Sequence, residues 1–72
     1  MRYAVVIEKE VASFGAYVPD LPGCVAVAKS RARVLRLMAE AIALHLADMR
    51  ERGERIPRPS TQVETLEVSV PA

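Results

Sequence analysis

The stretch from Ala32 to Arg52 contains neither Gly nor Pro, and it constrains the fold more than any other part of the chain. Apolar side chains recur in it every three or four residues, at Val34, Leu35, Met38, Ile42, Leu46 and Met49. This spacing places them on one face of an α-helix. Ser30 is a suitable N-cap, and Gly53 suits the position just past a helix end. The sequence therefore predicts one long amphipathic helix.

Three short segments before this helix have the period of two that is typical of β-strands. Residues 2–8 place Tyr3, Val5 and Ile7 on one face and Ala4 and Val6 on the other, and residues 14–18 and 24–28 alternate in the same way. Between the second and third segments, Pro22 followed by Gly23 suits a type II turn, because Gly accepts the positive φ of the second central position. We expect three strands joined as a meander.

After the helix, the connector Ile56-Pro57-Arg58-Pro59-Ser60 is predicted to be extended, because its prolines prevent a helix. Apolar residues Leu66, Val68 and Val70 then alternate with Glu67 and Ser69, which predicts a fourth strand ending at Pro71. The expected fold is α+β in the order β-β-β-α-β, a single domain over residues 1–72. The three-stranded antiparallel meander has the helix on one face, and the fourth strand runs parallel to the first at either sheet edge.

The uncovered face of such a sheet stays partly apolar, through Ala4 and Val6 or through Tyr3 and Val5. Leu37 and Leu44 lie on the flank of the helix stripe, outside its centre. Exposed apolar side chains of this kind are typical of contacts between subunits. We therefore predict a homodimer or a higher homo-oligomer that uses Leu37, Leu44 or the open sheet face.

Composition excludes several classes of protein. Ten basic against nine acidic residues give a net charge of +1, which offers no general attraction for nucleic acid or anionic lipid. No apolar run of about 18 residues is free of charge, so no membrane span is expected, and Glu8 interrupts the N-terminal apolar run too early for a secretory signal. We predict a soluble, cytoplasmic protein. The absence of Asn with eight Arg fits a thermophilic source or a codon bias.

No catalytic or metal-binding constellation is visible, and no cofactor is predicted. His45, the only histidine, falls within the apolar stripe with Asp48 three residues on, and Cys24 follows a turn where a small buried side chain fits. One cysteine forms neither an internal disulfide nor a structural zinc cage. The carboxylates that a metal would need are scattered, at Glu8, Glu10, Asp20, Glu40 and Asp48. A small hydrolase that uses Cys24 or His45 is the least favoured alternative.

A basic cluster lies at the helix start and consists of Lys29, Arg31, Arg33 and Arg36. The helix dipole disfavours cations there by a few tenths of a kcal/mol. The cluster is therefore a solvated rim, a contact for an acidic partner surface, or a contact for the phosphates of RNA or DNA. No aromatic residue interleaves it, which argues against stacking on single-stranded bases.

Several segments together resemble the HicB-like antitoxin family. They are Tyr3 to Glu8, the turn signature Val18-Pro19-Asp20-Leu21-Pro22-Gly23-Cys24, the helix segment Glu40 to Leu46, and the connector Ile56 to Ser60. The resemblance implies a small, partial ribonuclease-H-like unit with sheet order 3-2-1-4. It also implies a non-catalytic protein that covers the active surface of a small toxin, one that resembles double-stranded-RNA-binding proteins and cleaves mRNA.

Two departures from the family pattern bear on this expectation. Family members commonly carry acids at the helix start, where this chain has the bases Lys29, Arg31 and Arg33. Many also add a C-terminal DNA-binding segment, whereas this sequence ends at Ala72, so we expect no operator binding by this chain alone. The leading hypothesis is an antitoxin-like protein-binding module. The alternative is a domain that binds nucleic acid through the basic cluster.

Overall fold

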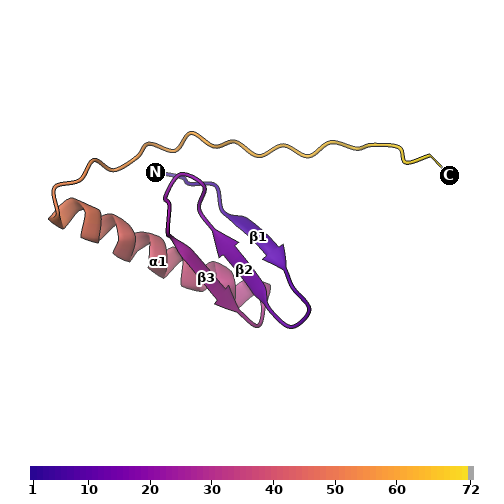
Figure 1. Ribbon diagram of the computed structural model, residues 1–72, viewed down its shortest axis with the longest axis horizontal. Helices are drawn as coiled ribbons and strands as arrows, with labels where there is room; N and C mark the ends of the chain where they lie inside the picture. The colour runs from indigo at the N-terminus through magenta and orange to yellow at the C-terminus, as the bar shows by residue number, and fades with distance from the viewer. Residues whose placement is uncertain (72) are drawn as a thin grey trace.

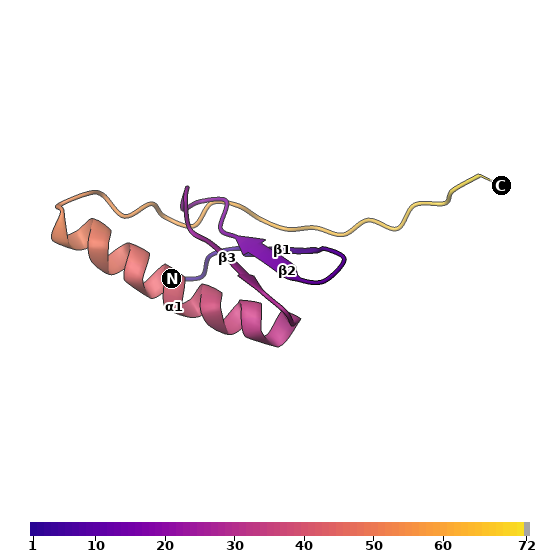
Figure 2. The ribbon, with the colours of Figure 1, turned by 60° about the horizontal axis from the view of Figure 1, so that its bottom comes forward.

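Three strands and one helix follow each other in the computed structural model, which describes residues 1–71. They are β1 (Val6–Lys9), β2 (Phe14–Tyr17), β3 (Val25–Ala28) and α1 (Arg31–Glu51). The strands form one antiparallel sheet in the order β1-β2-β3 (Figure 1). The sheet and α1 make two layers (Figure 2), with α1 packed against β2 and β3. The predicted meander and the predicted long helix are both confirmed.

The strand register decides which side chains face the helix. Ile7 lies opposite Ala16, and Ala16 lies opposite Ala26, so these three form one row across the sheet. This row faces α1 and contributes to a core whose fully buried residues are Ala16, Val18, Leu21, Cys24, Val34 and Met38. Small alanines in this row let the helix approach closely. The helix therefore covers the face that carries Tyr3, Val5 and Ile7, and Val6 belongs to the open face.

Both ends of α1 are capped as the sequence predicts. The Ser30 hydroxyl accepts a hydrogen bond from the Arg33 backbone N–H at 3.1 Å. At the other end Gly53 has φ 74°, its N–H donates to the Arg50 carbonyl, and the Glu54 N–H donates to the Met49 carbonyl. This pair of bonds is a Schellman motif. No helix within residues 1–71 is long and apolar enough to cross a membrane.

The turn between β2 and β3 is tight and anchored in the core. The Cys24 N–H donates to the Leu21 carbonyl at 3.1 Å, which leaves Pro22 and Gly23 as the central residues. Gly23 has φ 85°, as predicted for the second central position of a type II turn. Leu21 is 1% exposed. The turn therefore packs into the core through one leucine while its tip stays in solvent.

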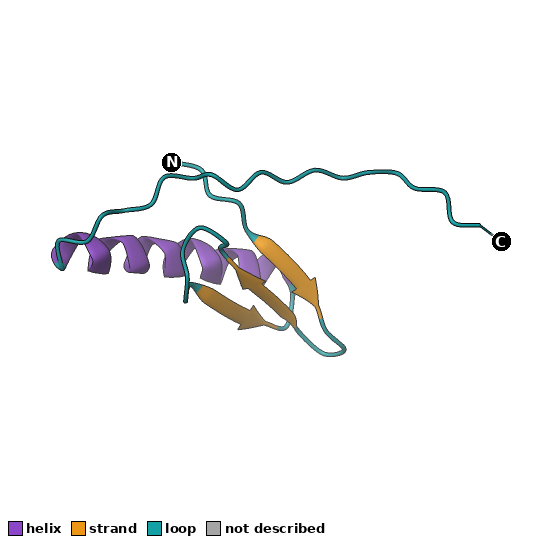
Figure 3. Cartoon of the chain, turned by 45° about the horizontal axis from the view of Figure 1, so that its top comes forward, coloured by secondary structure: helices purple, strands orange, loops and turns teal. Residues whose placement is uncertain are grey.

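Residues 54–71 differ from the prediction. They form one extended segment along the outside of the molecule (Figures 1 and 3), and none of them pairs with a strand. The predicted fourth strand at residues 66–70, its parallel alignment with β1 and the order 3-2-1-4 are therefore not formed in the described chain. The alternation records which side chains are apolar, but a strand also needs a sheet edge within reach. Here the connector directs the segment away from the sheet.

Candidate partner-binding surface

The open face of the sheet carries a row of apolar side chains on the side opposite α1. Val6 lies opposite Tyr17, and Tyr17 lies opposite Val25. Tyr17 is 40% exposed, Val25 63% and Val27 67%. We call Val6, Tyr17, Val25 and Val27 the outer face. Contiguous exposed apolar side chains of this kind mark interaction surfaces.

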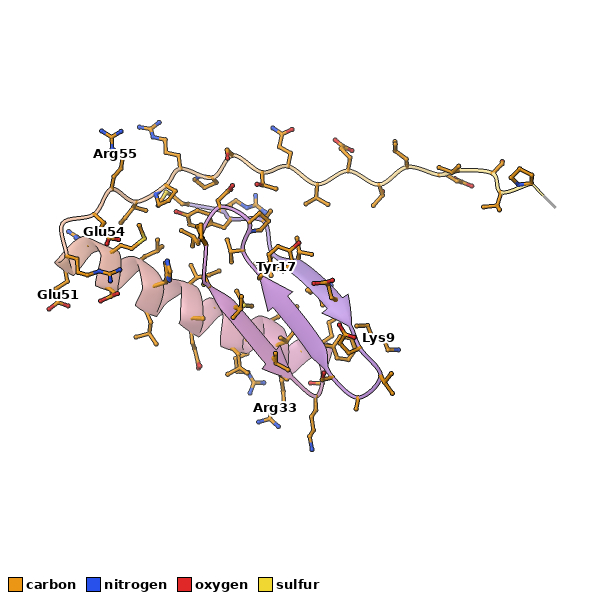
Figure 4. The ribbon with its side chains drawn as sticks, in the orientation of Figure 1. Lys9, Tyr17, Arg33, Glu51, Glu54 and Arg55 are labelled. Atoms are coloured by element: carbon orange, nitrogen blue, oxygen red, sulfur yellow. The ribbon has the colours of Figure 1, made fainter. Side chains whose placement is uncertain are left out.

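The outer face follows from strands that are apolar on both sides. In β3 the alanines point to the helix and the larger valines point to solvent, which reverses the usual order of buried and exposed side chains. Gly15 lies opposite Val27 and has no side chain, and the space above it is open. Val27 and Tyr17 are therefore accessible to a partner on the side of the sheet opposite α1. The Tyr17 side chain is labelled in Figure 4.

Sequence reasoning predicted an open apolar face but missed most of its residues. It named Ala4 and Val6, or Tyr3 and Val5, and left out Tyr17, Val25 and Val27. The missing signal was the register: once Val6 is opposite Tyr17, both belong to the face that α1 leaves open. Strand alternation alone does not say which face the helix covers.

A hollow lies beside the outer face, between the β2–β3 turn and the second half of α1. It is lined by Gly23, Cys24, Val25, Ala41, Leu44, His45 and Asp48. Leu44 is 71% exposed, so the apolar surface continues from Val25 onto the helix. Leu37 is also exposed. The use of Leu37 and Leu44 in self-association stays a prediction.

Cys24 and His45 both line this hollow, but the structure does not join them as a reactive pair. Among residues 1–71 no hydrogen bond links the Cys24 thiol to the His45 ring. Cys24 is 3% exposed, and this burial raises the pKa of its thiol. A raised pKa keeps the thiol protonated and a poor nucleophile. Cys24 is therefore a packing residue of the turn.

Metal-ligating residues are also dispersed. The structure, as far as it is described, holds no group of three His, Cys, Asp or Glu side chains placed to bind a metal ion. The acids Glu8, Glu10 and Glu40 are exposed on different elements. Asp48 forms an ion pair at 3.1 Å with Arg52, the C-cap residue of α1.

Asp20 joins two motifs that are 40 residues apart in the sequence. Its carboxylate accepts from the backbone N–H groups of Ser60 at 2.9 Å and Thr61 at 3.1 Å. It also accepts from the Thr61 hydroxyl at 2.7 Å and the Ser60 hydroxyl at 3.1 Å. We call this four-bond contact the Asp20 clamp. Nearby, the Tyr3 hydroxyl donates to the Pro57 carbonyl.

The clamp explains why an aspartate lies in the turn. The Ser60 backbone N–H, followed by the donors of Thr61, lowers the pKa of Asp20 to about 2 against the opposing effect of partial desolvation. Sequence reasoning listed Asp20 only as part of a turn signature and as one scattered carboxylate. The sequence signal that could have indicated the clamp is the pair of hydroxyl residues Ser60 and Thr61, directly after Pro59.

The basic cluster of Lys29, Arg31, Arg33 and Arg36 is exposed throughout. The Arg33 side chain extends away from the body of the molecule (Figure 4). The first turn of α1 carries no acidic residue, and no ion pair within residues 1–71 involves the cluster. The four side chains are therefore available to a partner, and their role as a partner or nucleic-acid contact stays a prediction.

Comparison with known proteins identifies the family. The profile of the family described as HicB_like antitoxin of bacterial toxin-antitoxin system matches residues 3–70. The chain belongs to this family. The match covers both the described elements and the extended C-terminal segment, so that segment is part of what this HicB-like chain shares with the family.

Individual relatives agree with this assignment. A UPF0150 protein of Helicobacter pylori is 48% identical over 49 residues, 68% of each chain. An uncharacterised 14.9 kDa protein from the rep-hol intergenic region of Haemophilus phage HP1 is 33% identical over 58 residues. That match covers 81% of this chain but only 44% of the phage protein. Among solved structures, a chain of the HicA3 and HicB3 toxin-antitoxin complex matches with a TM-score of 0.71 and 30% identity. It covers 83% of this chain and 70% of that chain.

Proposed function

We propose that this HicB-like chain neutralises a small mRNA-cleaving toxin by covering the toxin's active surface. The observation that carries the proposal is the outer face, an exposed apolar surface on a chain of an antitoxin family. The complex in which the matching solved chain occurs contains a toxin and an antitoxin, which supports a partner of the same kind here. Since such a toxin acts on mRNA, we expect the pair to act in the cytoplasm.

The outer face has the properties of a protein contact. Tyr is among the residues that dominate binding energies, because its ring buries a large area with little loss of conformational freedom. Fully burying a valine side chain contributes about 1.5–3 kcal/mol. Val25 lies opposite Tyr17 and Val27 lies opposite Gly15 on the same face, and both valines are more than half exposed, so much of this gain is still available.

We also propose that the domain is a partial ribonuclease-H-like scaffold that works without catalysis. A fold shared with nucleases carries no activity by itself, since activity depends on the residues at the site. The acids of the described residues form no group that could hold a metal ion, and the thiol is buried. Inhibition by occlusion needs only a complementary surface. The fourth strand of this scaffold would form when residues 66–70 meet a sheet edge.

The test is co-expression with the small protein encoded beside this gene. We expect the chain to restore growth when that protein arrests it, and to form a complex in a pull-down. Val25→Asp combined with Val27→Asp should weaken binding at least about tenfold, because it buries unpaired charge at the contact. Val11→Asp is the matched control, since Val11 is a fully exposed valine in the β1–β2 loop.

Two results would contradict the proposal. The first is the absence of any complex together with continued growth arrest. The second is a doubly substituted chain that folds normally by circular dichroism and binds as well as the Val11→Asp control. The first result removes the antitoxin function, and the second moves the contact to another surface.

A further inference from the structure

The outer edge of β1 and the extended residues 63–70 are both without a neighbouring strand, and each could serve as the neighbour of the other. Within residues 1–71, strand β1 pairs with β2 alone, so one of its edges presents free backbone N–H and C=O groups. Such an edge is a template for another strand. Residues 63–70 are extended, unpaired and free of proline, and their apolar side chains Val63, Leu66, Val68 and Val70 are 67–87% exposed.

The direction of this segment is fixed near its start. The Asp20 clamp holds Ser60 and Thr61 to the β2–β3 turn, and the Tyr3 hydroxyl holds Pro57. Beyond Thr61 the chain runs out past the sheet in each view of the ribbon (Figures 1, 2 and 3). The radius of gyration is 14.8 Å, whereas a compact chain of this length has about 11 Å. The segment thus leaves its own β1 edge open and extends beyond the sheet, where a second molecule can reach it.

The side-chain pattern suits the edge of β1. Leu66, Val68 and Val70 lie on one side of the extended segment, and Glu67 and Ser69 lie on the other. On the side that faces the helix, Ile7 of β1 and Val5, which directly precedes β1, are only half-buried. A strand added beside β1 would place its apolar row next to these residues and keep its polar row in water, with the alternation of a half-buried strand.

We propose that residues 63–70 of one copy pair with β1 of a second copy, and the reverse, in a homodimer with exchanged strands. Each copy offers one such segment and one open β1 edge, so two copies related by a two-fold axis satisfy both. The contact is continuous with the core, because the added strand extends the face that α1 covers. This inference concerns self-association and is independent of the toxin.

The first experiment is sedimentation of the full chain without a partner. We expect a dimer at tens of micromolar, an order of magnitude typical of modest interfaces. Leu66→Ser combined with Val68→Ser should raise the dissociation constant at least about tenfold, because it removes the apolar row. Glu67→Ser is the matched control and should leave the dimer intact, since Glu67 lies on the polar side. A monomeric wild-type chain would overturn the proposal.

The second experiment asks whose β1 is paired. A mixture of isotope-labelled and unlabelled chains, unfolded and refolded together, should give intermolecular contacts in NMR spectra between the β1 region and residues 66–70. Contacts only within one chain would overturn the exchange, because they place the fourth strand on its own sheet. A dimer that survives Leu66→Ser and Val68→Ser but dissociates with Val25→Asp and Val27→Asp would also overturn it and assign the dimer to the outer face.

The same experiments separate this inference from the proposed function. The dimer is measured on the chain alone, and Val25→Asp with Val27→Asp should preserve it while toxin binding is lost. If the chain is monomeric alone and the Leu66→Ser and Val68→Ser variant loses only toxin binding, the segment pairs with the toxin and the exchanged dimer is wrong.

Discussion

Strand β3 and residues 66–70 of the C-terminal segment both alternate with a period of two, large with small side chains in β3 and apolar with polar side chains in residues 66–70, yet only β3 is part of the sheet. In β3, Ala26 and Ala28 pack against α1, and backbone pairing with β2 holds the strand. In the C-terminal segment the apolar side chains stay in solvent and the backbone is unpaired. Alternation permits a strand, but a neighbouring edge and a covering layer are needed to form one.

The two regions are also held by different forces. The body, residues 1–53, is stabilised by burial of apolar side chains between sheet and helix. Residues 54–71 are attached to this body near their start: Ser60 and Thr61 donate hydrogen bonds to the Asp20 carboxylate, and the Pro57 carbonyl accepts one from the Tyr3 hydroxyl. Apolar burial depends little on pH, whereas a carboxylate contact titrates. The regions should therefore respond separately to mutation and to acid.

The largest effect is expected from the core of the body. Met38→Ala should destabilise the protein by about 2–5 kcal/mol, because it removes a fully buried side chain and leaves a cavity. A domain of this size has a total stability of only about 4–10 kcal/mol, so the variant should be close to unfolding. Urea denaturation followed by circular dichroism measures the change.

Leu44→Ala on the same helix is the matched control and should shift the free energy of unfolding by less than about 0.5 kcal/mol, since Leu44 is mostly exposed. If Leu44→Ala lowered the free energy of unfolding as much as Met38→Ala, the expected difference between a buried and an exposed position of α1 would be absent. This result would mean that Leu44 is buried in solution, as it would be within an oligomer.

The second effect is local and pH-dependent. An unfolded aspartate has a pKa of about 3.9, and the clamp lowers the pKa of Asp20 to about 2. Because the folded value is the lower one, the clamp stabilises the docked connector fully above about pH 4 and is lost as the pH falls through about 2. The backbone amide resonances of Ser60 and Thr61 should therefore shift over this range, while those of Val34 and Met38 stay constant.

Asp20→Asn provides the control for this titration. The neutral amide has only one oxygen to accept the four donors, so the Ser60 and Thr61 resonances should lack the pH dependence and resemble those of the acid form. If the helix resonances move together with those of Thr61, the clamp is part of the cooperative unit of the body, and the separation of the two regions fails.

The smallest effect is expected at the basic cluster of the body. In the variant Arg33→Glu with Arg36→Glu, the change at position 33 should raise stability by a few tenths of a kcal/mol, because it places an acid in the first turn of α1, where the helix dipole favours negative charge. If the cluster contacts phosphates, the same variant should abolish the salt-dependent binding of RNA in a mobility shift. Wild-type chain that binds no RNA at low salt would leave the cluster as a solvated rim or a protein contact.

Much of the fold could be predicted from local signals. The helix from Arg31 to Glu51 was visible in its apolar stripe, in its Ser30 cap and in Gly53, because these interactions join residues at most a few positions apart. The candidate site was less visible. Tyr17, Val25 and Val27 became a surface only through the pairing of β2 with both neighbours. The Asp20 clamp spans 40 residues, and no periodicity reports such a contact.

The sequence by itself determined the three strands, the tight turn, the capped helix and the family, since propensity, capping and motif spacing are properties of neighbouring residues. Only the tertiary structure decided which sheet face α1 covers, what Asp20 holds, and that residues 66–70 lie outside the sheet. Apolar side chains gain free energy from any suitable surface, so their pattern does not name the surface. Which surface they contact depends on where the folded chain leaves a sheet edge unpaired or a sheet face uncovered.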